Sequence, residues 1–287
     1  KLRTDDFDYE LPEELIAQTP TEPRDHARLL VVDMDADRRE DRHFYDLPAY
    51  LHPGDALIIN ETRVIPARLL GVKEDTGVPV EVLLLRRMNA TDWEALVRPG
   101  RRLKPGTRCV FGEGLLTCEV LKNVEETGGR LVRFAYDGVF EAILDRLGEM
   151  PLPPYIRGEL SDGERYQTVY SCTPGSAAAP TAGLHFTPAL LDHIRSMGVT
   201  VCTVTLHVGL GTFRPVREEE IENHTMHSEF CLVPKETADC VNRCKGRVIA
   251  VGTTSCRTLE SVATFRGKIE AAEGNTDIFI YPGYEFK

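Results

Sequence analysis

Hydrophobic and polar positions outside the middle of the chain follow two patterns that alternate along the sequence. Apolar runs with the composition of strands lie at 28–33, 56–60, 199–208, 247–251 and 277–281. Apolar residues three and four positions apart predict helices at 140–147, 187–197, 235–244 and 258–263, and a short helix beginning at Pro12. Because strands that alternate with helices build a layered sheet, these segments predict an α/β arrangement.

The segment from 62 to 137 has a different pattern. Short runs rich in Val and Leu alternate with turn signals such as Pro99-Gly100 and Pro105-Gly106. Short strands at a spacing of about 8–12 residues are typical of a small barrel or sandwich. We therefore predict an α/β (α+β) main domain of residues 1–61 and 138–287, with an inserted six-stranded β-barrel domain of residues 62–137. The barrel strands are expected at 64–70, 80–85, 93–97, 108–111, 115–121 and 131–136.

Composition narrows the class of protein. The 287 residues are 42% hydrophobic and 28% charged, which is typical of a globular chain and excludes collagen-like fibres. The longest stretch without a charged residue, 167–191, contains three prolines and His185, so it predicts no membrane span. No secretory leader is recognisable at the start, and the eight cysteines show no C-x-x-C spacing. We expect a cytoplasmic protein with reduced, structural thiols.

Charge is divided unevenly along the chain. The formal net charge is −11, yet residues 62–137 contain 13 Lys and Arg against 10 Asp and Glu. Within this part, five basic residues follow one another with no acid between them, and a cluster of this kind is either a solvated surface or a contact for phosphates. The five are Arg98, Arg101, Arg102, Lys104 and Arg108.

Candidate chemistry lies where polar residues follow strands, because loops at strand ends position reactive groups. Four segments have this property. Residues 179–187 form a small-residue loop with His185, and residues 205–215 deliver His207 to a glycine turn. Residues 223–229 contain two imidazoles and a carboxylate, and residues 247–257 run from a strand into a hydroxyl-rich turn.

Each segment has an alternative interpretation. Gly209-Leu-Gly211 lacks the third glycine of a dinucleotide loop and is followed by Pro215, so a Rossmann fingerprint is rejected. His224, His227 and Glu229 are a possible metal set without the spacing of a zincin helix. The hydroxyls of 253–255 either cap a helix or form an anion site.

Eight sequence blocks closely resemble the S-adenosylmethionine:tRNA ribosyltransferase-isomerase family of queuosine biosynthesis. They include Asn60-Glu-Thr-Arg-Val-Ile-Pro-Ala-Arg68, Ala179-Pro-Thr-Ala-Gly-Leu-His-Phe186, Leu206-His-Val-Gly-Leu-Gly-Thr-Phe-Arg-Pro-Val216 and Gly252-Thr-Thr-Ser255. The others lie at 7–12, 152–155, 226–229 and 277–284. Members of the family continue with an Asn-Phe-His-Leu-Pro-type segment, whereas this sequence ends at Lys287, so a histidine of that segment is not among the candidates.

The resemblance implies a monomeric enzyme without a metal or a resident cofactor, with a small β-barrel beside a larger α/β domain. The partners it implies are S-adenosylmethionine, consumed as the ribosyl donor, and tRNA whose wobble base is 7-aminomethyl-7-deazaguanine. The products would be epoxyqueuosine in tRNA, adenine and methionine. We expect Arg98, Arg101, Arg102, Lys104 and Arg108 to bind the tRNA.

The reaction needs a base for the ribose 5′ proton, which the sulfonium acidifies, and an acid for the departing adenine. We expect two or three of His185, His207, His227 and Glu229 to converge on one pocket, with His207 or His227 as the base. The sulfonium would contact Phe213, Tyr281 or Tyr284, and the methionine carboxylate would bind at 252–255 and Arg257. The candidate substrate-binding residues are Thr181, Gly183, Gly209, Gly211, Phe213, Thr253, Thr254, Ser255, Arg257, Asp277 and Tyr281.

Two other classes of protein stay open from the residues. One is a metal-dependent hydrolase built on His224, His227 and Glu229. The other is a non-catalytic RNA-binding module, which would bind tRNA but not S-adenosylmethionine.

Overall fold

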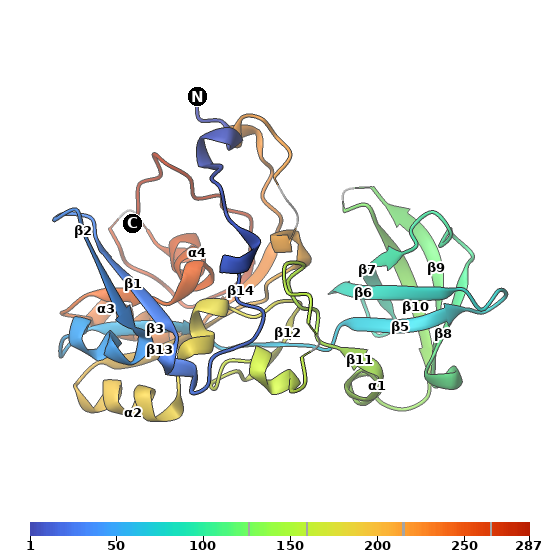
Figure 1. Ribbon diagram of the computed structural model, residues 1–287, viewed down its shortest axis with the longest axis horizontal. Coiled ribbons are helices and arrows are strands. Elements are labelled where there is room, and N and C mark those ends of the chain that lie inside the picture. Colours follow the sequence, from blue (N-terminus) through green and yellow to red (C-terminus); the bar gives the residue numbers. More distant parts are fainter. Residues whose placement is uncertain (126, 159, 214–215, 265) are drawn as a thin grey trace. The chain divides into compact units, whose positions relative to one another are not determined.

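The computed structural model describes residues 1–125, 127–158, 160–213, 216–264 and 266–287, and the side chains of Leu210 and Phe213 lie outside this description. The described chain divides into two compact units (Figure 1). The α/β unit consists of Lys1–Arg63 and Pro154–Lys287, and the barrel unit consists of Val64–Pro153. The fold class expected from the sequence, a mixed α/β unit with an inserted barrel, is confirmed.

The central sheet of the α/β unit has the strand order β15-β3-β13-β14-β16 within the described residues. β3 is parallel to β13 and β15, whereas β14 is antiparallel to both β13 and β16. Two small sheets, β1-β2 and β12-β4, accompany it. The strands are β1 (Arg28–Asp33), β2 (Arg38–His43), β3 (Ala56–Asn60), β4 (Thr62–Val64), β12 (Thr173–Ser176), β13 (Thr200–Leu206), β14 (Glu229–Val233), β15 (Val248–Ala250) and β16 (Ala272–Thr276).

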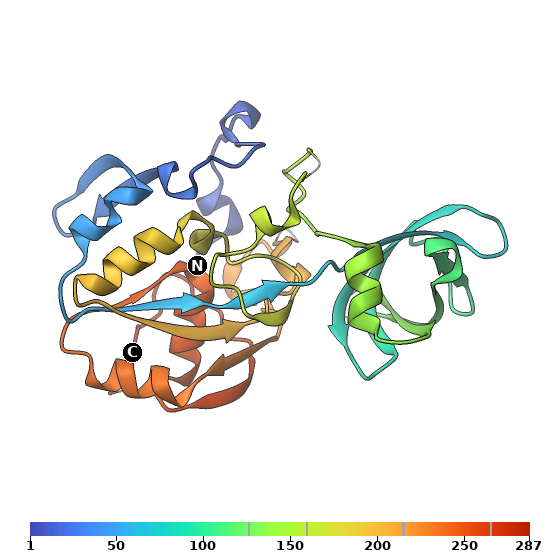
Figure 2. The ribbon, with the colours of Figure 1, turned by 90° about the horizontal axis from the view of Figure 1, so that it is seen from below.

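Both faces of this sheet are covered, as Figure 2 shows for α2 and α3 on opposite sides. One core joins alternate residues of β3, such as Leu57 and Ile59, to Leu190 and Ile194 of α2. The other joins Ile58 to residues of α3 and α4. The unit's helices are α2 (Pro188–Ser196), α3 (Lys235–Arg243) and α4 (Gly252–Val262), with 3-10 helices η1 (Thr4–Phe7), η2 (Glu13–Leu15), η3 (Arg24–His26), η4 (Phe44–Tyr50), η6 (Gly163–Tyr166), η7 (Thr181–His185), η8 (Leu210–Phe213) and η9 (Ile221–Asn223).

The barrel unit closes on itself. Its sheet order is β11-β5-β6-β7-β10-β9-β8, and the pairing of β5 with β8 completes a six-stranded barrel among the described residues. Its core joins Leu69, Phe111 and Phe134 to Phe140 of α1. The elements are β5 (Arg68–Lys73), β6 (Pro79–Arg87), β7 (Asp92–Arg98), β8 (Arg108–Phe111), η5 (Gly112–Gly114), β9 (Leu116–Val124), β10 (Gly129–Tyr136), α1 (Phe140–Leu147) and β11 (Gly148–Glu149).

Several expected elements differ from the structure. The prediction of a strand at 277–281 is wrong, because the segment that pairs with β14 is 272–276. The segment 64–70 is broken at Pro66 into the end of β4 and the start of β5. The helix expected from Pro12 is only the 3-10 turn η2, and α4 begins at Gly252 rather than at 258. The helix α1, which the sequence boundary at 137 assigned to the α/β domain, lies in the barrel unit because Phe140, Ile143 and Leu144 complete the barrel core.

Candidate active site

The candidate residues gather at one edge of the central sheet. The parallel strands β3, β13 and β15 all end at this edge, where ligands of α/β sheets bind. β14 is antiparallel to β13, so it begins here with Glu229, and β16 ends here with Thr276, the partner of Glu229 in the ladder. Five strands therefore bring segments from the whole unit to a single edge.

Glu229 is the centre of the polar contacts at this edge, and it is only 7% exposed. The backbone N–H of Gly209 donates to its Oε1 over 2.7 Å. Nε2 of His227 lies 2.9 Å from the same oxygen. Oε2 accepts a hydrogen bond from Nη1 of Arg257, and the two groups form an ion pair. Both oxygens of this buried carboxylate are thus occupied, as a buried charge requires.

Arg257 comes from α4 and is itself 7% exposed. Its Nε donates to the carbonyl oxygen of Ile278 over 3.1 Å. Its Nη2 donates to the carbonyl oxygens of His227, over 3.0 Å, and Thr276, over 3.2 Å. These bonds and the bond to Glu229 use most of the guanidinium donors, so Arg257 holds Glu229 in place, and the carboxylate-binding role expected from the sequence stays a prediction.

The contact with Glu229 orients the His227 ring. In the neutral ring, a proton on Nε2 that is donated to the carboxylate leaves the lone pair on Nδ1. Within the described part of the chain, Nδ1 has no hydrogen-bond partner. The ring lies against Gly211, where an added Cβ would be 2.6 Å from Nδ1. The arrangement is that of an oriented imidazole with one nitrogen available as a base.

His207 lies on the other face of the sheet. Its backbone N–H donates to the carbonyl oxygen of Phe230, and its ring stacks on that of Phe230 at 5.3 Å. Its Nδ1 is 2.8 Å from Oγ1 of Thr62. Because side chains alternate along a strand and Leu206 pairs with Cys231, His207 shares a face with Phe230 and not with Glu229. Burial lowers the pKa of His207, which favours the neutral imidazole.

His185 also lies apart from the Glu229 contacts. It ends η7 and its ring is 5.2 Å from that of Phe44. Burial, with smaller contributions from Arg165 and Arg24, lowers its pKa. Of the four catalytic candidates, of which two or three were expected to converge, the described residues show a direct contact between two, His227 and Glu229. The ring contacts of His207 and His185 are instead with Phe230 and Phe44.

The loop at 179–187 meets the start of α4. A Cβ on Gly252 would lie 3.2 Å from Cβ of Ala182, so these two predicted segments are neighbours. Thr181 is exposed, whereas Gly183 is buried where a Cβ would be 2.0 Å from the Tyr170 hydroxyl oxygen, which explains the need for glycine there.

The first turn of α4 contains all three predicted hydroxyl residues. Thr253 is exposed, and Ser255 is fully buried. The buried side-chain oxygens of Thr254 and Ser255 have no hydrogen-bond partner in the described chain. Buried hydroxyls of this kind at a helix N-terminus are compatible with an anion-binding turn.

The aromatic candidates follow β16 or lie outside the described side chains. Tyr281 is 36% exposed and its ring is 5.3 Å from that of Phe279. The hydroxyl of Tyr284 donates to Glu260 over 3.0 Å. Asp277 is exposed directly after β16. Phe213 ends η8, and its side chain, like residues 214–215 of the glycine turn, lies outside the described part.

The proposed metal set is not assembled in the part of the chain that the structure describes. Nδ1 of His224 lies 3.1 Å from Glu218, and its ring contacts Phe279, whereas His227 contacts Glu229. No group of three or more His, Cys, Asp and Glu side chains there is placed to hold a metal ion. No helix among the described residues is long and apolar enough to cross a membrane.

Sequence reasoning did not single out Asn60, which organises this edge. It is 1% exposed at the end of β3. Its amide donates to the carbonyl oxygen of Leu206, and its Oδ1 accepts from the N–H groups of Leu206 and Thr62, all at about 3 Å. The signal was a polar residue that ends an otherwise apolar strand, Ala56-Leu-Ile-Ile-Asn60.

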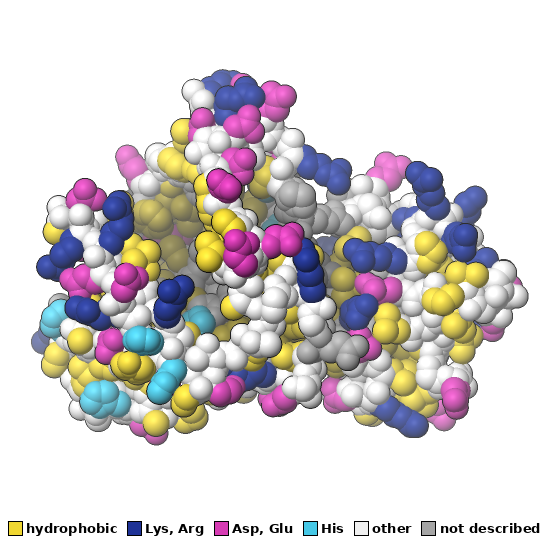
Figure 3. Space-filling view, viewed as in Figure 1, with side chains coloured by type: hydrophobic (Ala, Val, Ile, Leu, Met, Phe, Trp, Pro, Cys, Tyr) yellow, Lys and Arg dark blue, Asp and Glu magenta, His cyan; other side chains and the backbone are white. Residues whose placement is uncertain are grey.

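The basic candidates lie together on the barrel unit, between β7 and β8. Arg98 ends β7, Arg108 begins β8, and Arg101, Arg102 and Lys104 lie in the loop between them. All five are exposed, and Figure 3 shows Lys and Arg side chains on the surface of this unit. Arg108 is paired with Glu74 at 3.4 Å.

Comparisons with known proteins give matches over nearly the whole chain. A family model described as "Queuosine biosynthesis protein" matches residues 4–287. Relatives from Symbiobacterium thermophilum and Caldanaerobacter subterraneus, both named S-adenosylmethionine:tRNA ribosyltransferase-isomerase, are 58% and 57% identical over all of this chain and 84% of their own length. A Thermotoga maritima crystal structure titled S-adenosylmethionine tRNA ribosyltransferase is 38% identical, over 98% of this chain and 81% of that chain, with a TM-score of 0.48.

Proposed function

Because the chain belongs to the queuosine biosynthesis family of tRNA ribosyltransferase-isomerases, we propose that it transfers the ribosyl part of S-adenosylmethionine to the wobble base of tRNA. The acceptor is the aminomethyl nitrogen of 7-aminomethyl-7-deazaguanine. The transferred ribosyl part is rearranged to an epoxycyclopentanediol, which gives epoxyqueuosine, adenine and methionine. The donor is consumed, so the reaction as proposed needs no resident cofactor, and the chain acts as a monomer.

The observation that carries this proposal is the contact of His227 with Glu229 at the ligand-binding edge of the sheet. The reaction begins with removal of a proton from the 5′ carbon of the ribose, which the positive sulfur makes acidic. A neutral imidazole with an unperturbed pKa of about 6.5 is suited to this step. His227 has one nitrogen bonded to Glu229, and its other nitrogen has no hydrogen-bond partner among the described residues, which is the geometry that a general base requires.

In this mechanism, Nδ1 of His227 accepts the 5′ proton. The imidazolium that forms is stabilised by Glu229, whose charge lies 2.9 Å from Nε2. Arg257 holds the carboxylate in place from the other side, so that Glu229 does not rotate away during the transfer. The sequence left His207 and His227 as alternative bases, and the contact with a carboxylate favours His227.

Two charged groups of the donor, its methionine carboxylate and its sulfonium, have candidate partners in this unit. We propose that the methionine carboxylate binds at the first turn of α4, where backbone N–H groups and the hydroxyls of Thr253 and Thr254 lie. Tyr281, which is partly exposed in the segment after β16, is proposed to face the sulfonium, a contact worth about 0.5–2 kcal/mol. Arg257 is not proposed as the carboxylate ligand, because most of its N–H donors bond to groups within the protein.

The test is incubation of the protein with S-adenosylmethionine and a tRNA that contains 7-aminomethyl-7-deazaguanine. Mass spectrometry should detect free adenine and methionine, and digestion of the tRNA should yield epoxyqueuosine. The matched control is the same tRNA with guanine at the wobble position, which has no aminomethyl nitrogen and should give no modified nucleoside. Binding of tRNA without any release of adenine would overturn the proposal in favour of a non-catalytic RNA-binding module.

A further inference from the structure

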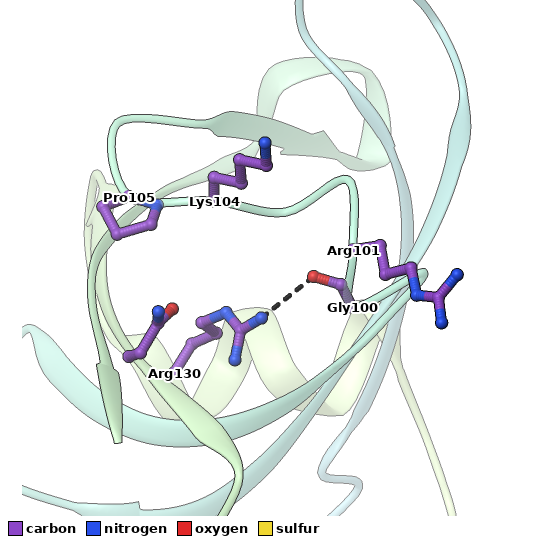
Figure 4. Close-up of a pocket in the computed structure, with 6 residues that line it drawn as sticks. Gly100, Arg101, Lys104, Pro105 and Arg130 are labelled. Carbon is purple, nitrogen blue, oxygen red and sulfur yellow. Dashed lines mark hydrogen bonds between the residues drawn. The ribbon is translucent and has the colours of Figure 1, made fainter. Parts of the chain in front are cut away.

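The loop between β7 and β8 surrounds an open depression in the barrel unit. The depression has a volume of about 510 Å³ and is lined by Arg101, Lys104 and Arg130, among others. In Figure 4, Lys104 and Arg130 lie on different sides of it, and the side chain of Arg101 extends outward from the loop. Its other lining residues are Gly100, Pro105 and Asn123. No acidic side chain lines it within the described residues, so its polar surface is that of a cation-rich, anion-accepting site.

This loop is fixed to the barrel at two points. Leu103, between Arg102 and Lys104, is fully buried and belongs to the barrel core. Arg130 of β10 donates from Nε to the carbonyl oxygen of Leu103 over 3.0 Å, and from Nη2 to that of Gly100 over 2.9 Å. The flanking cations are therefore carried by a loop whose backbone is held, which limits the entropy lost when they bind a ligand.

Four basic side chains in and beside this loop have no acidic partner among the described residues. Elsewhere in the barrel unit, six Lys and Arg side chains have an acidic partner within 4 Å. By contrast, Arg98, Arg101, Arg102 and Lys104 have no ion pair in the described part of the chain. Residues 98–104 contain four positive charges and no acid, which is the densest run of basic residues in the sequence.

We infer that this depression binds the phosphodiester backbone of RNA, with Arg101 and Lys104 as phosphate contacts. The inference rests on the proposed function for the identity of the nucleic acid and adds to it where a part of that RNA is held. The depression is open, so a chain that continues on both sides of the bound phosphate can enter it. Cations that hold no acid can bind phosphates and release their counterions.

Arg130 is a positioning residue in this site. Its Nη1 donates to the carbonyl oxygen of Gly129 over 2.9 Å, in addition to the bonds to Gly100 and Leu103, so its guanidinium is used within the barrel. Lysine keeps the charge but cannot reproduce this planar set of donors. If Arg130 contacted phosphate only as a charge, lysine would replace it fully.

The experiment measures binding of an unmodified tRNA transcript by fluorescence anisotropy between about 50 and 200 mM salt. Replacing Arg101 and Lys104 together by Gln should lower the affinity by about tenfold to a hundredfold and reduce the slope of log affinity against log salt by about 2. The matched control replaces Lys73 and Arg146, two cations of the same unit outside the loop, by Gln. It removes the same charge and should change the affinity by less than about threefold.

A third variant, Arg130→Lys, should bind tRNA more weakly than the wild type with an unchanged salt slope. If Arg130→Lys bound tRNA with the affinity of the wild type, the positioning role would be overturned.

Equal losses of affinity in the Arg101/Lys104 variant and in the control would show diffuse attraction and would overturn the site. Stronger binding of the wild type to vesicles of anionic lipid than to tRNA would also overturn the site. If the wild type releases adenine but the double variant binds normally, the inference alone fails. If the variant loses binding but the wild type never releases adenine, the proposed function alone fails.

Discussion

Nε2 of His227 lies 2.9 Å from Oε1 of Glu229, and the backbone N–H of Gly209 donates to the same oxygen over 2.7 Å. The two side chains come from residues only two positions apart, at the entry to β14. The carboxylate is buried and held by Arg257 from a different element, so the imidazole is oriented against a fixed partner. This pair determines what the site can do and what its variants should show.

The first prediction concerns the base. His227→Gln should lower the single-turnover rate of adenine release by about 10²–10⁴-fold, because it removes the group that accepts the 5′ proton. Binding of tRNA should be unchanged. The matched control is His224→Gln, which removes a nearby imidazole that contacts Glu218 and Phe279 instead. Similar rates for the wild type and the His227 variant would eliminate His227 as the base.

The second prediction separates two roles for Arg257. Arg257 bonds to Glu229 and to the carbonyl oxygens of His227, Thr276 and Ile278. If its role is to position these groups, Arg257→Lys should lower kcat by about tenfold or more, with little change in the KM for S-adenosylmethionine. If it bound the methionine carboxylate, the KM would rise instead. Steady-state kinetics distinguishes the two results, and thermal unfolding shows whether the variant is folded.

The parts of the fold that could be predicted are those whose signal is local. The predicted bounds are found for the strands 28–33, 56–60 and 108–111 and for the helix 140–147. The signals for these elements are alternation, apolar runs and a following glycine, and each signal lies within a few consecutive residues. The barrel was predictable for the same reason, since regular turn signals separate its strands.

The parts that could not be predicted depend on pairing between distant segments. β14 pairs with Ala272–Thr276, and the more apolar run at 277–281 that follows forms no strand; the carbonyl of Ile278 instead accepts from Arg257. The separation of His207 from Glu229 has the same origin. The pairing of Leu206 with Cys231 decides which face each side chain occupies, and a shift of one residue would reverse it. No pattern within either strand contains that register.

The third prediction uses two glycines of one loop. A Cβ at Gly211 would lie 2.6 Å from Nδ1 of His227, so Gly211→Ala should displace the ring from its contact with Glu229 and lower adenine release by about tenfold or more. A Cβ at Gly209 would be 3.6 Å from Oε1 of Glu229, an ordinary contact, and its N–H would still donate. Gly209→Ala is therefore the matched control, and equal losses in both variants would refute this account of the loop.

The last prediction concerns pH and stability through His207. Its pKa is lowered in the folded protein because burial disfavours the imidazolium, so below the ordinary value of about 6.5 the unfolded chain binds this proton more readily than the folded chain does. The stability contributed by the neutral ring is present above that value and is lost as the pH falls below it. Urea unfolding should therefore show that the wild type loses more stability than His207→Gln between pH 7.5 and pH 5.5. Because Gln does not titrate and can still hydrogen-bond to Thr62, the difference between the two proteins isolates this imidazole from the carboxylates that titrate at lower pH. Parallel losses in both proteins across this range would show that His207 does not contribute to the pH dependence.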